Sequence, residues 1–516
     1  MKRTKSSIIN LIIAMMGQGA GLIISFIARI IFIKYLSAEY LGLNGLFTNI
    51  LTILSLVELG VGPAMTFSLY KPLAKKDTKK VKSLMKLYQK VYCIIGVLVL
   101  ILGIGFTPFY KYLIDEVPNI PNLDLIYILF VVNTAVSYFY SYKRSLIICD
   151  QKRYIATIYR YSFYFILNVL QIIALMLTKN YILFLILQIV STWLENFFVS
   201  RKTNKMYPYL KEKDIIPLEK EEVNGIKKNV GAMVFHKIGG MVVNSTDNII
   251  MSKIVGLVAV GIYSNYYLII QALETVIMQV FNAIVASIGN LSATEDKSKM
   301  KDIFNKTFFI DFWIFAFCTT CLLVLYNDFI TLWVGKEYLF HFSIIITICI
   351  CFYLKGIRRA VLTFRDATGS FYYDRYKPLF EAVINLVVSI ILAKQLGVVG
   401  IFIGTIISTI TTSIWVEPYV LYKYVFNMKV NDYFKRLIGY SIIGLIICTI
   451  TYYICSFFTN LNWITLIIKA IICLVFINLM FIIVFRNTKE FIYFKELILK
   501  IIGKFKNIKK LKNIKN

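Results

Sequence analysis

The sequence predicts an all-α integral membrane protein that crosses the bilayer about fourteen times. Two properties of its 516 residues support this fold class: 58% are hydrophobic, and the mean hydropathy is +0.71. Soluble domains are typically about 45–50% apolar, so a single aqueous core would not absorb the excess. The charged residues, 16% of the chain, cluster between long apolar runs. Such runs suit membrane helices, because a helix in hydrocarbon pairs its own backbone polar groups.

The expected spans follow one another along most of the chain. They cover approximately residues 8–34, 44–70, 90–108, 123–148, 154–178, 181–199, 229–253, 259–288, 304–326, 341–364, 377–394, 400–424, 436–457 and 463–485. Lysine and arginine are abundant in every second loop and in the tail after Arg486, and sparse in the loops between. This positive-inside pattern predicts a multi-pass protein of the bacterial cytoplasmic membrane with both termini in the cytoplasm. It also explains the net charge of +29 without a nucleic-acid partner.

The chain repeats itself at offsets of 215–219 residues. The matches are Tyr159-Arg160 with Tyr376-Lys377, Asn168 with Asn385, Lys143-Arg144 with Arg358-Arg359, Ser191-Thr192 with Ser408-Thr409, and Leu41-Gly42-Leu43-Asn44 with Val260-Gly261-Ile262-Tyr263. We therefore expect two six-helix bundles in the same topology, a plan that recurs among transporters. The expected domains are the bundles at residues 1–200 and 229–425, a cytoplasmic linker at 201–228, two added helices at 426–485, and a basic tail at 486–516.

Polar residues recur at helical spacing in the first two spans of each bundle. An ionisable residue in hydrocarbon is costly, and it is therefore a functional candidate. The expected substrate-binding residues are Ser25, Arg29, His236, Lys237, Asn244, Asp247 and Gln271, and the expected cavity carboxylates are Glu58 and Glu274. We expect these stripes to line one water-accessible cavity between the two bundles.

Structural roles remain open for several of these positions. Gly17 and Gly21, on the same helix face, also suit helix packing. Arg29 and Lys237 would alternatively anchor their helices at the membrane surface, where long basic side chains reach the headgroups. Glu58 would alternatively be a buried partner of one of these cations. Four further charges are expected at the cytoplasmic interface: Arg160, Glu195, Glu381 and Glu417.

Cations on both bundles suit an anionic cargo. Arginine presents a fork of donors to phosphate oxygens, and lysine presents a point charge. A lipid-linked sugar pyrophosphate has such a headgroup, which needs a polar path while its lipid chain stays in the bilayer. The carboxylates would bind a coupling proton or Na⁺, or they would accept hydrogen bonds from sugar hydroxyls.

The sequence carries no signature of an enzyme. A P-loop is absent. The pair Cys318 and Cys321 lies inside an apolar span, where thiols suit packing better than a metal. We therefore expect a protein without enzymatic activity, metal or cofactor, apart from a coupling ion.

Two regions resemble a known family. The first comprises Phe26-Ile27-Ala28-Arg29, the segment EYLGLNGLF at 39–47 and SLVELGVG at 55–62, and the second comprises DNIIMS at 247–252 and VGIY at 260–263. They are similar to the Wzx-type polysaccharide repeat-unit flippases of the multidrug/oligosaccharidyl-lipid/polysaccharide exporter superfamily. The resemblance implies a MATE-like fold with alternating access, and a polyprenyl-pyrophosphate-linked oligosaccharide as cargo. It also implies that Arg29, Lys237 and Asp247 act in export.

We predict a flippase that moves this oligosaccharide repeat unit from the cytoplasmic to the outer leaflet, for capsule, O-antigen or other surface polysaccharide. Its expected partners are the lipid-linked cargo, membrane lipids, and a polysaccharide polymerase with its chain-length machinery; nucleic acid is not expected. A multidrug extruder of the same superfamily is the alternative, and it would favour an acidic cavity. A membrane polysaccharide polymerase or ligase is an alternative from another class. That enzyme would need a large outer loop, whereas the outer loops here are short.

Overall fold

The computed structural model describes residues 2–58, 61–212, 216–219, 245–294, 296–370 and 373–496, with single positions at 221, 223, 224, 226 and 499. Every regular element in these ranges is a helix, which confirms the predicted all-α class. Nine of the described helices are long and apolar enough to cross a bilayer, or ten if one bent pair counts as a span. All of them fall on expected spans, so the prediction of a polytopic membrane protein is confirmed.

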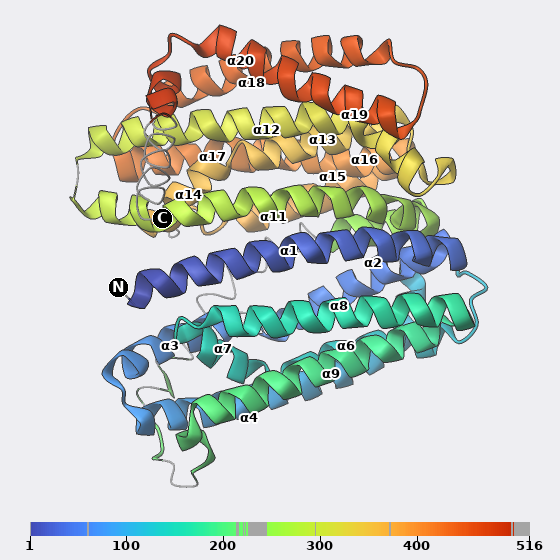
Figure 1. Cartoon of the computed structure of the whole chain (residues 1–516), viewed down its shortest axis with the longest axis vertical. Coiled ribbons are helices and arrows are strands. Elements are labelled where there is room, and N and C mark those ends of the chain that lie inside the picture. Colours follow the sequence, from blue (N-terminus) through green and yellow to red (C-terminus); the bar gives the residue numbers. More distant parts are fainter. Residues whose placement is uncertain are drawn as a thin grey trace, which may run out of the picture. The chain divides into compact units, whose positions relative to one another are not determined.

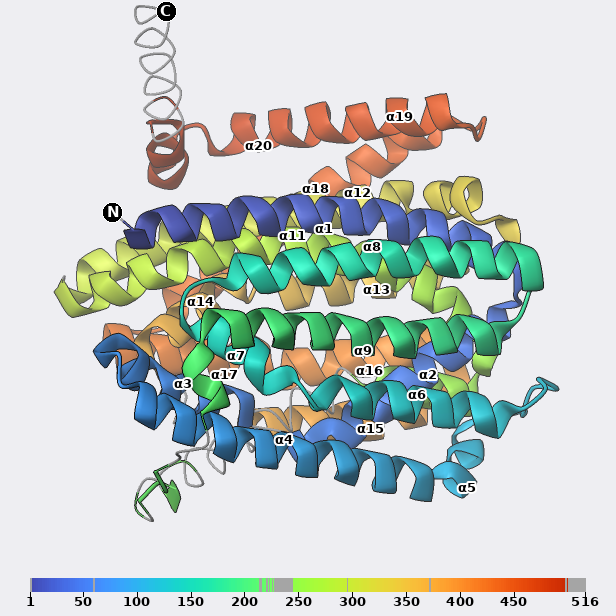
Figure 2. The ribbon, with the colours of Figure 1, turned by 60° about the horizontal axis from the view of Figure 1, so that its bottom comes forward.

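The first of two compact units contains Met1–Ser264 and Ser389–Ile401. Its elements are α1 (Lys2–Tyr35), α2 (Ala38–Leu54), η1 (Ser55–Glu58), α3 (Val61–Lys75), α4 (Thr78–Gly105), α5 (Thr107–Tyr110), η2 (Lys111–Leu113), α6 (Leu123–Tyr138), α7 (Ser141–Cys149), α8 (Arg153–Thr178), α9 (Tyr181–Met206), η3 (Pro208–Lys211), a helix over residues 245–254 and the start of α11 (Leu257–Thr294). Within this unit α1 packs along α8, α8 along α9, α9 along α6, and α6 along α4 (Figure 1 and Figure 2). Side-chain caps begin the long helices: Asp77 accepts from the N–H of Lys80 at the start of α4 (2.9 Å), and Asn180 accepts from that of Ile182 at the start of α9 (2.8 Å).

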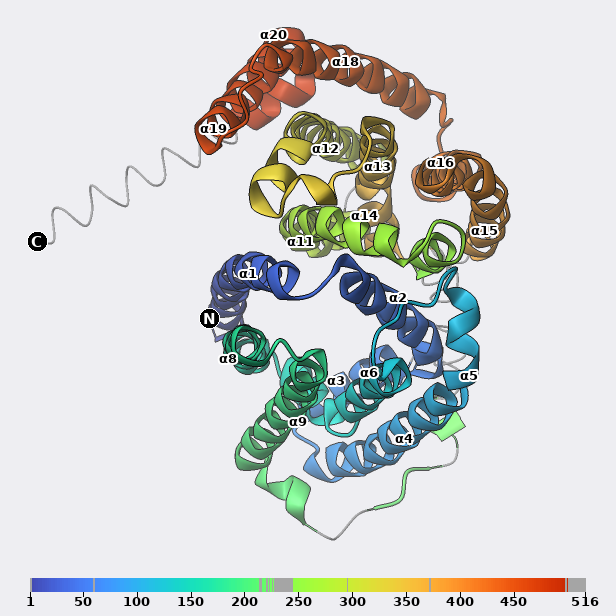
Figure 3. The same cartoon turned by 90° about the vertical axis from the view of Figure 1, so that its right-hand side faces the viewer.

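The second unit contains Asn265–Val388 and Phe402–Asn516. Its elements are the rest of α11, α12 (Lys297–Trp333), η4 (Lys336–Tyr338), α13 (Phe342–Gly356), α14 (Arg359–Thr368), α15 (Lys377–Leu396), α16 (Val398–Ser408), η5 (Thr409–Ser413), α17 (Ile414–Val420), η6 (Leu421–Phe426), α18 (Asn431–Ser456), α19 (Trp463–Ile472), η7 (Cys473–Ile477) and α20 (Asn478–Phe485). The segments η5, η6 and η7 are π-helical turns, so α16–η6 and α19–α20 each form one continuous span. Helices α18 and α19 lie against α12 (Figure 3).

Aromatic side chains on one face of α12 hold α18 in place. Phe304, Phe308 and Phe312 are four residues apart and therefore share a helix face, and all three are fully buried. The ring of Phe308 lies 4.9 Å from that of Tyr433, and the ring of Phe312 stacks on Tyr440 at 4.7 Å. The two C-terminal spans are thus attached to the second unit by an aromatic core.

Three of the expected spans are broken helices, which the sequence analysis did not predict. The expected span 44–70 consists of α2, η1 and α3, and the span 341–364 consists of α13 and α14. The span 123–148 consists of α6 and α7, which bend by 42° at their junction. The expected span 229–253 lies outside the described residues except for its last part, 245–253.

The breaks extend the internal repeat from sequence to structure. The break before α7 precedes Lys143-Arg144, and the break before α14 coincides with the corresponding pair Arg358-Arg359. A broken helix exposes backbone polar groups, which are tolerated at membrane depth only where protein or water satisfies them. Both repeats therefore place two cations next to a polar helix break.

The repeated glycines Gly42 and Gly261 meet each other inside the first unit. A Cβ atom on Gly261 would lie 2.1 Å from the carbonyl oxygen of Ala38 and 3.2 Å from the backbone nitrogen of Gly42. A Cβ atom on Gly42 would lie 2.1 Å from the carbonyl oxygen of Leu257. The backbones of α2 and of the first turns of α11 thus touch, and this contact requires small residues in both helices.

We expect the substitution Gly261→Ala to lower the free energy of unfolding by about 1–3 kcal/mol or more, because the new methyl group meets backbone atoms that cannot move aside. The measurement is thermal unfolding of the purified protein in detergent. Gly19→Ala is the matched control, since a Cβ atom there would have no heavy atom within 4 Å. Equal stability of the two variants would contradict the close contact.

Candidate functional site

Ser25 and Arg29 lie on one face of α1 and contact two other helices. The hydroxyl of Ser25 is 2.6 Å from that of Tyr164 on α8. The Nη1 atom of Arg29 donates to the Oγ atom of Ser264 on α11, at 2.8 Å. All four residues belong to the first unit. They form a polar cluster, hereafter the Arg29 cluster, inside three long and mainly apolar helices.

The glycines one and two turns before Ser25 explain how α1 reaches α8. A Cβ atom on Gly17 would lie 2.3 Å from the ring of Tyr161, and one on Gly21 would lie 3.1 Å from it. The packing interpretation of these two glycines is therefore confirmed. Their role is to let Tyr161 approach α1, which brings Tyr164, one turn further along α8, to Ser25.

The guanidinium of Arg29 has a neutral hydrogen-bond partner in the described part of the chain. Among the described residues, no carboxylate lies within ion-pair distance of it, and its hydrogen-bond partner Ser264 is neutral. Arginine has five N–H donors in a fixed fork and does not lose its proton in proteins. Because the side chain is half-buried, this charge is only partly hydrated. The geometry leaves donors for an anion at membrane depth.

Glu58 lies in η1, at the break between α2 and α3. The hydroxyl of Tyr92 on α4 donates to its Oε1 atom at 3.4 Å, and Tyr138 on α6 lies close enough to interact with the same carboxylate. The rings of Tyr92 and Tyr138 stack with centroids 6.4 Å apart. A half-buried carboxylate at a helix break, with hydroxyl donors around it, is suited to binding a cation or a proton.

The second carboxylate of the predicted pair is engaged in a salt bridge. Glu274 on α11 pairs with Lys355 on α13 at 2.8 Å, within the second unit. Gln271, one turn earlier on α11, is exposed. Asp247 is half-buried in the helix over residues 245–254, in the first unit.

Three predicted site residues, His236, Lys237 and Asn244, lie outside the described residues. The structure therefore brings together Ser25 and Arg29 of the predicted set, with Glu58 elsewhere in the same unit. The common cavity that would join them to Glu274 and Gln271 stays a prediction. Tyr164 and Ser264, which complete the Arg29 cluster, were not predicted, because neither residue is charged at neutral pH and each lies far from Arg29 in sequence.

A buried cluster of four charged residues in the described part of the second unit was also missed. The Nη2 atom of Arg358 donates to Glu417 at 2.7 Å, and the Nζ atom of Lys377 donates to Glu417 at 2.7 Å and to Ser413 at 2.8 Å. Lys377 also pairs with Glu381, one turn along α15, at 3.0 Å. We call Arg358, Lys377, Glu381 and Glu417 the α14–α17 ion cluster.

Glu381 and Glu417 are buried within the protein, and their expected place near the cytoplasmic interface stays a prediction. The side chain of Glu417 has no exposed area, and that of Glu381 is 10% exposed. Two cations face two carboxylates, so the cluster is neutral overall and is suited to fastening the broken helix rather than to binding a charged ligand. Asp311 on α12 fastens the same helix, because its Oδ2 atom accepts from the N–H of Ala360 at 2.8 Å.

Known proteins resemble this chain in their solved structures but not in their sequences. The sequence matches no family profile and no curated protein. An inward-facing multidrug resistance MATE family transporter of the MOP superfamily matches with a TM-score of 0.64 and 14% identity, over 80% of this chain and 98% of the transporter. The lipid II flippase MurJ, in an inward closed conformation, matches with a TM-score of 0.63 and 16% identity, over 92% of this chain and 99% of MurJ. A mutant of the Vibrio cholerae MATE transporter VcmN matches with a TM-score of 0.55 and 12% identity, over 83% of this chain and 99% of VcmN.

The chain has a MATE-like fold. The fold expected from the sequence resemblance is thereby confirmed. At these identities the similarity concerns the fold alone, so membership of the Wzx-type flippases stays a prediction. Among the described residues, Arg29 has no carboxylate partner, whereas the α14–α17 ion cluster is neutral overall.

We expect Glu417→Gln to lower the free energy of unfolding by about 3–5 kcal/mol, because Arg358 and Lys377 would remain buried without their shared partner. Thermal unfolding of the purified protein measures the effect. Asp302→Asn is the control: it breaks the ion pair with Lys306, in which the aspartate is 55% exposed, and should change stability by about 0–1 kcal/mol. A Glu417→Gln protein as stable as the control would show that the cluster does not fasten the helix.

Proposed function

We propose that the protein is a flippase that carries a polyprenyl-pyrophosphate-linked oligosaccharide repeat unit from the cytoplasmic to the outer leaflet of the bacterial cytoplasmic membrane, for surface polysaccharide synthesis. The observation that carries this proposal is the half-buried guanidinium of Arg29 inside a membrane helix, for which the described residues supply no carboxylate partner. An intramembrane cation without an acidic partner points to an anionic cargo.

A pyrophosphate headgroup fits the chemistry of this site. The planar guanidinium can bind two phosphate oxygens at once, and Ser25, Tyr164 and Ser264 add hydroxyls that exchange hydrogen bonds with phosphate or sugar. The lipid chain would remain in the bilayer while the headgroup passes the cluster. Lys237, predicted from the sequence to face the same cargo, would supply a second charge.

The extent of the structural matches favours a lipid-linked cargo. The match to MurJ covers 92% of this chain and that to the MATE transporter covers 80%, a difference of about 60 of the 516 residues. The span pair from α18 to α20, Asn431–Phe485, is of this size. Since MurJ is named for flipping lipid II, we infer that this chain shares the mode of transport of that flippase rather than drug extrusion.

Transport would proceed by alternating access of a cationic cavity. Solved MATE structures include both inward-facing and outward-facing conformations, so the fold supports the motion. Glu58, at a helix break, is our candidate for the proton or Na⁺ that drives it, with Glu274 as the second candidate. The polysaccharide polymerase and its chain-length machinery would take over the cargo at the outer face.

A multidrug extruder is the second candidate, because a MATE transporter matches with a TM-score as high as that of MurJ. A cationic drug would be repelled by Arg29, whose charge no described carboxylate offsets. The two functions therefore predict opposite effects of removing this charge.

We expect Arg29→Ala to reduce export of surface polysaccharide by at least about tenfold, which corresponds to the loss of one charge-assisted contact of about 1.5 kcal/mol. Export is measured as polysaccharide on the cell surface, with the amount of protein in the membrane measured in parallel. Arg29→Lys should restore part of the activity. The matched control is Lys34→Ala, which removes an exposed cation one to two turns further along α1. Normal export by Arg29→Ala would refute the role of this charge.

We expect cysteines at Ser25, Ser55 and Gln271 to react with a small membrane-impermeant thiol reagent, because a transport cavity must hold water. The test uses a protein whose nine native cysteines are replaced by serine, and it includes a cysteine at Asn244. A cysteine at Leu445, which is 68% exposed in the middle of the apolar helix α18, is the control that should stay unlabelled. Failure of all four test positions to react would exclude the cavity.

A further inference from the structure

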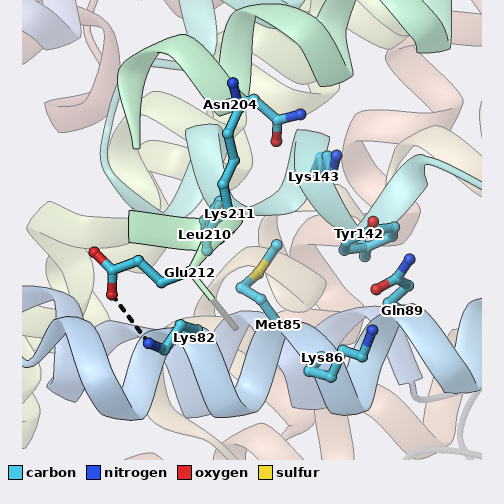
Figure 4. Close-up of a pocket in the computed structure, with 10 residues that line it drawn as sticks. All are labelled: Lys82, Met85, Lys86, Gln89, Tyr142, Lys143, Asn204, Leu210, Lys211 and Glu212. Carbon is cyan, nitrogen blue, oxygen red and sulfur yellow. Dashed lines mark hydrogen bonds and ion pairs between the residues drawn. The ribbon is translucent and has the colours of Figure 1, made fainter. Parts of the chain in front are cut away.

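A pocket at one end of the first unit is lined mainly by lysine and amide side chains. It has a volume of about 410 Å³, within the range of small-ligand pockets. Its lining residues come from α4, α7, α9 and the segment η3 with the residue that follows it (Figure 4): Lys82, Met85, Lys86, Gln89, Tyr142, Lys143, Asn204, Leu210, Lys211 and Glu212. All of them are described residues of one compact unit.

The pocket carries a net positive charge. Glu212 pairs with Lys82 at 3.0 Å, which neutralises one of the four lysines. Lys86, Lys143 and Lys211 have no carboxylate partner among the described residues, and Lys143 and Lys211 repel each other. Bringing like charges together is unfavourable unless an anion lies between them. The amides of Gln89 and Asn204 add neutral hydrogen-bonding groups.

The two sequence repeats differ in the residue that faces the first cation of each pair, Lys143 or Arg358. Lys143 donates to the hydroxyl of Ser200 at 2.8 Å. At the corresponding positions of the second unit, Arg358 donates to Glu417. The second unit thus neutralises this cation with its own carboxylate, whereas the first unit places a serine there. The Lys143 ammonium is consequently available to an external anion.

The pocket lies at the polar end of α4 and near the C-terminus of α9. Lys82, Lys86 and Gln89 occupy the first turns of α4, and the long apolar run of that helix begins after Lys90. Asn204 lies in the last turn of α9. The distribution of basic residues assigns this end of the unit to the cytoplasmic side. Anionic lipids in the cytoplasmic leaflet are attracted to such lysine clusters.

We propose that this pocket binds a phosphate-bearing headgroup, with Lys86, Lys143 and Lys211 as the charged contacts and Gln89 and Asn204 as hydrogen-bonding partners. The source that the position of the pocket favours is a membrane lipid with a phosphate monoester or diphosphate. The site is separate from the Arg29 cluster, and its existence does not depend on the transported cargo.

The test uses the full chain purified in maltoside micelles, which contain no phosphate. Binding constants are measured for dioctanoyl phosphatidic acid, for the uncharged lipid dioctanoyl glycerol, and for inorganic pyrophosphate. The pocket variant combines Lys86→Gln, Lys143→Gln and Lys211→Gln. The control variant combines Lys79→Gln, Lys90→Gln and Lys202→Gln, which removes the same charge from exposed positions that do not line the pocket. A double variant, Lys86→Gln with Lys211→Gln, changes exposed residues alone. It separates a loss of binding from a folding defect of the triple variant.

We expect phosphatidic acid to bind the pocket variant at least about tenfold more weakly than the control variant, since charge-assisted contacts are lost. Competition by pyrophosphate would support the phosphate as the recognised group, and lipid binding without competition would support the whole headgroup. The Arg29→Ala protein should bind phosphatidic acid normally, which separates this proposal from the flippase proposal. Equal binding by the pocket and control variants would overturn it. So would equal affinity of the wild type for dioctanoyl glycerol and phosphatidic acid.

Discussion

The cost of holding a charge among apolar helices organises this structure. An ionised side chain in hydrocarbon costs at least a few kcal/mol unless protein groups replace its water. The chain meets this constraint with pairs that link different helices: Arg144 with Glu195, Lys469 with Asp328, and Arg358 and Lys377 with Glu417. Against this pattern Arg29 is an exception, because its described partner is a neutral hydroxyl. This exception is the basis of the anionic cargo that we propose.

The two sequence repeats place similar helix breaks in different electrostatic surroundings. Each unit has a helix that breaks next to two adjacent cations, at Lys143-Arg144 and at Arg358-Arg359. In the second unit, Glu417 and Glu381 neutralise Arg358, and the broken helix is fixed in place. In the first unit, a serine replaces the carboxylate and a basic pocket results. Corresponding positions thus form a neutral ion cluster in one unit and a basic pocket in the other.

Sequence reasoning reached the features that depend on local pattern. Hydropathy predicted the spans, and periodic spacing placed Ser25 and Arg29 on one helix face. It could not predict the breaks at Glu58 and between α6 and α7, because a break depends on which polar groups surround it in three dimensions. The burial of Glu417 was missed for a similar reason, since its partner Arg358 lies 59 residues away. One sign of it was present: Lys377, Glu381 and Glu417 lie near the same end of two adjacent expected spans.

Transport of a lipid-linked anion is tested most directly in a reconstituted system. The purified protein is placed in vesicles that contain a fluorescent polyprenyl-pyrophosphate oligosaccharide, and the share of headgroups reachable by a membrane-impermeant quencher is followed over time. We expect the quenchable share of headgroups to rise from about half to nearly all, and only in vesicles that contain the active protein. A fluorescent organic cation should not be moved. Movement of the cation without movement of the lipid-linked oligosaccharide would contradict the proposed function.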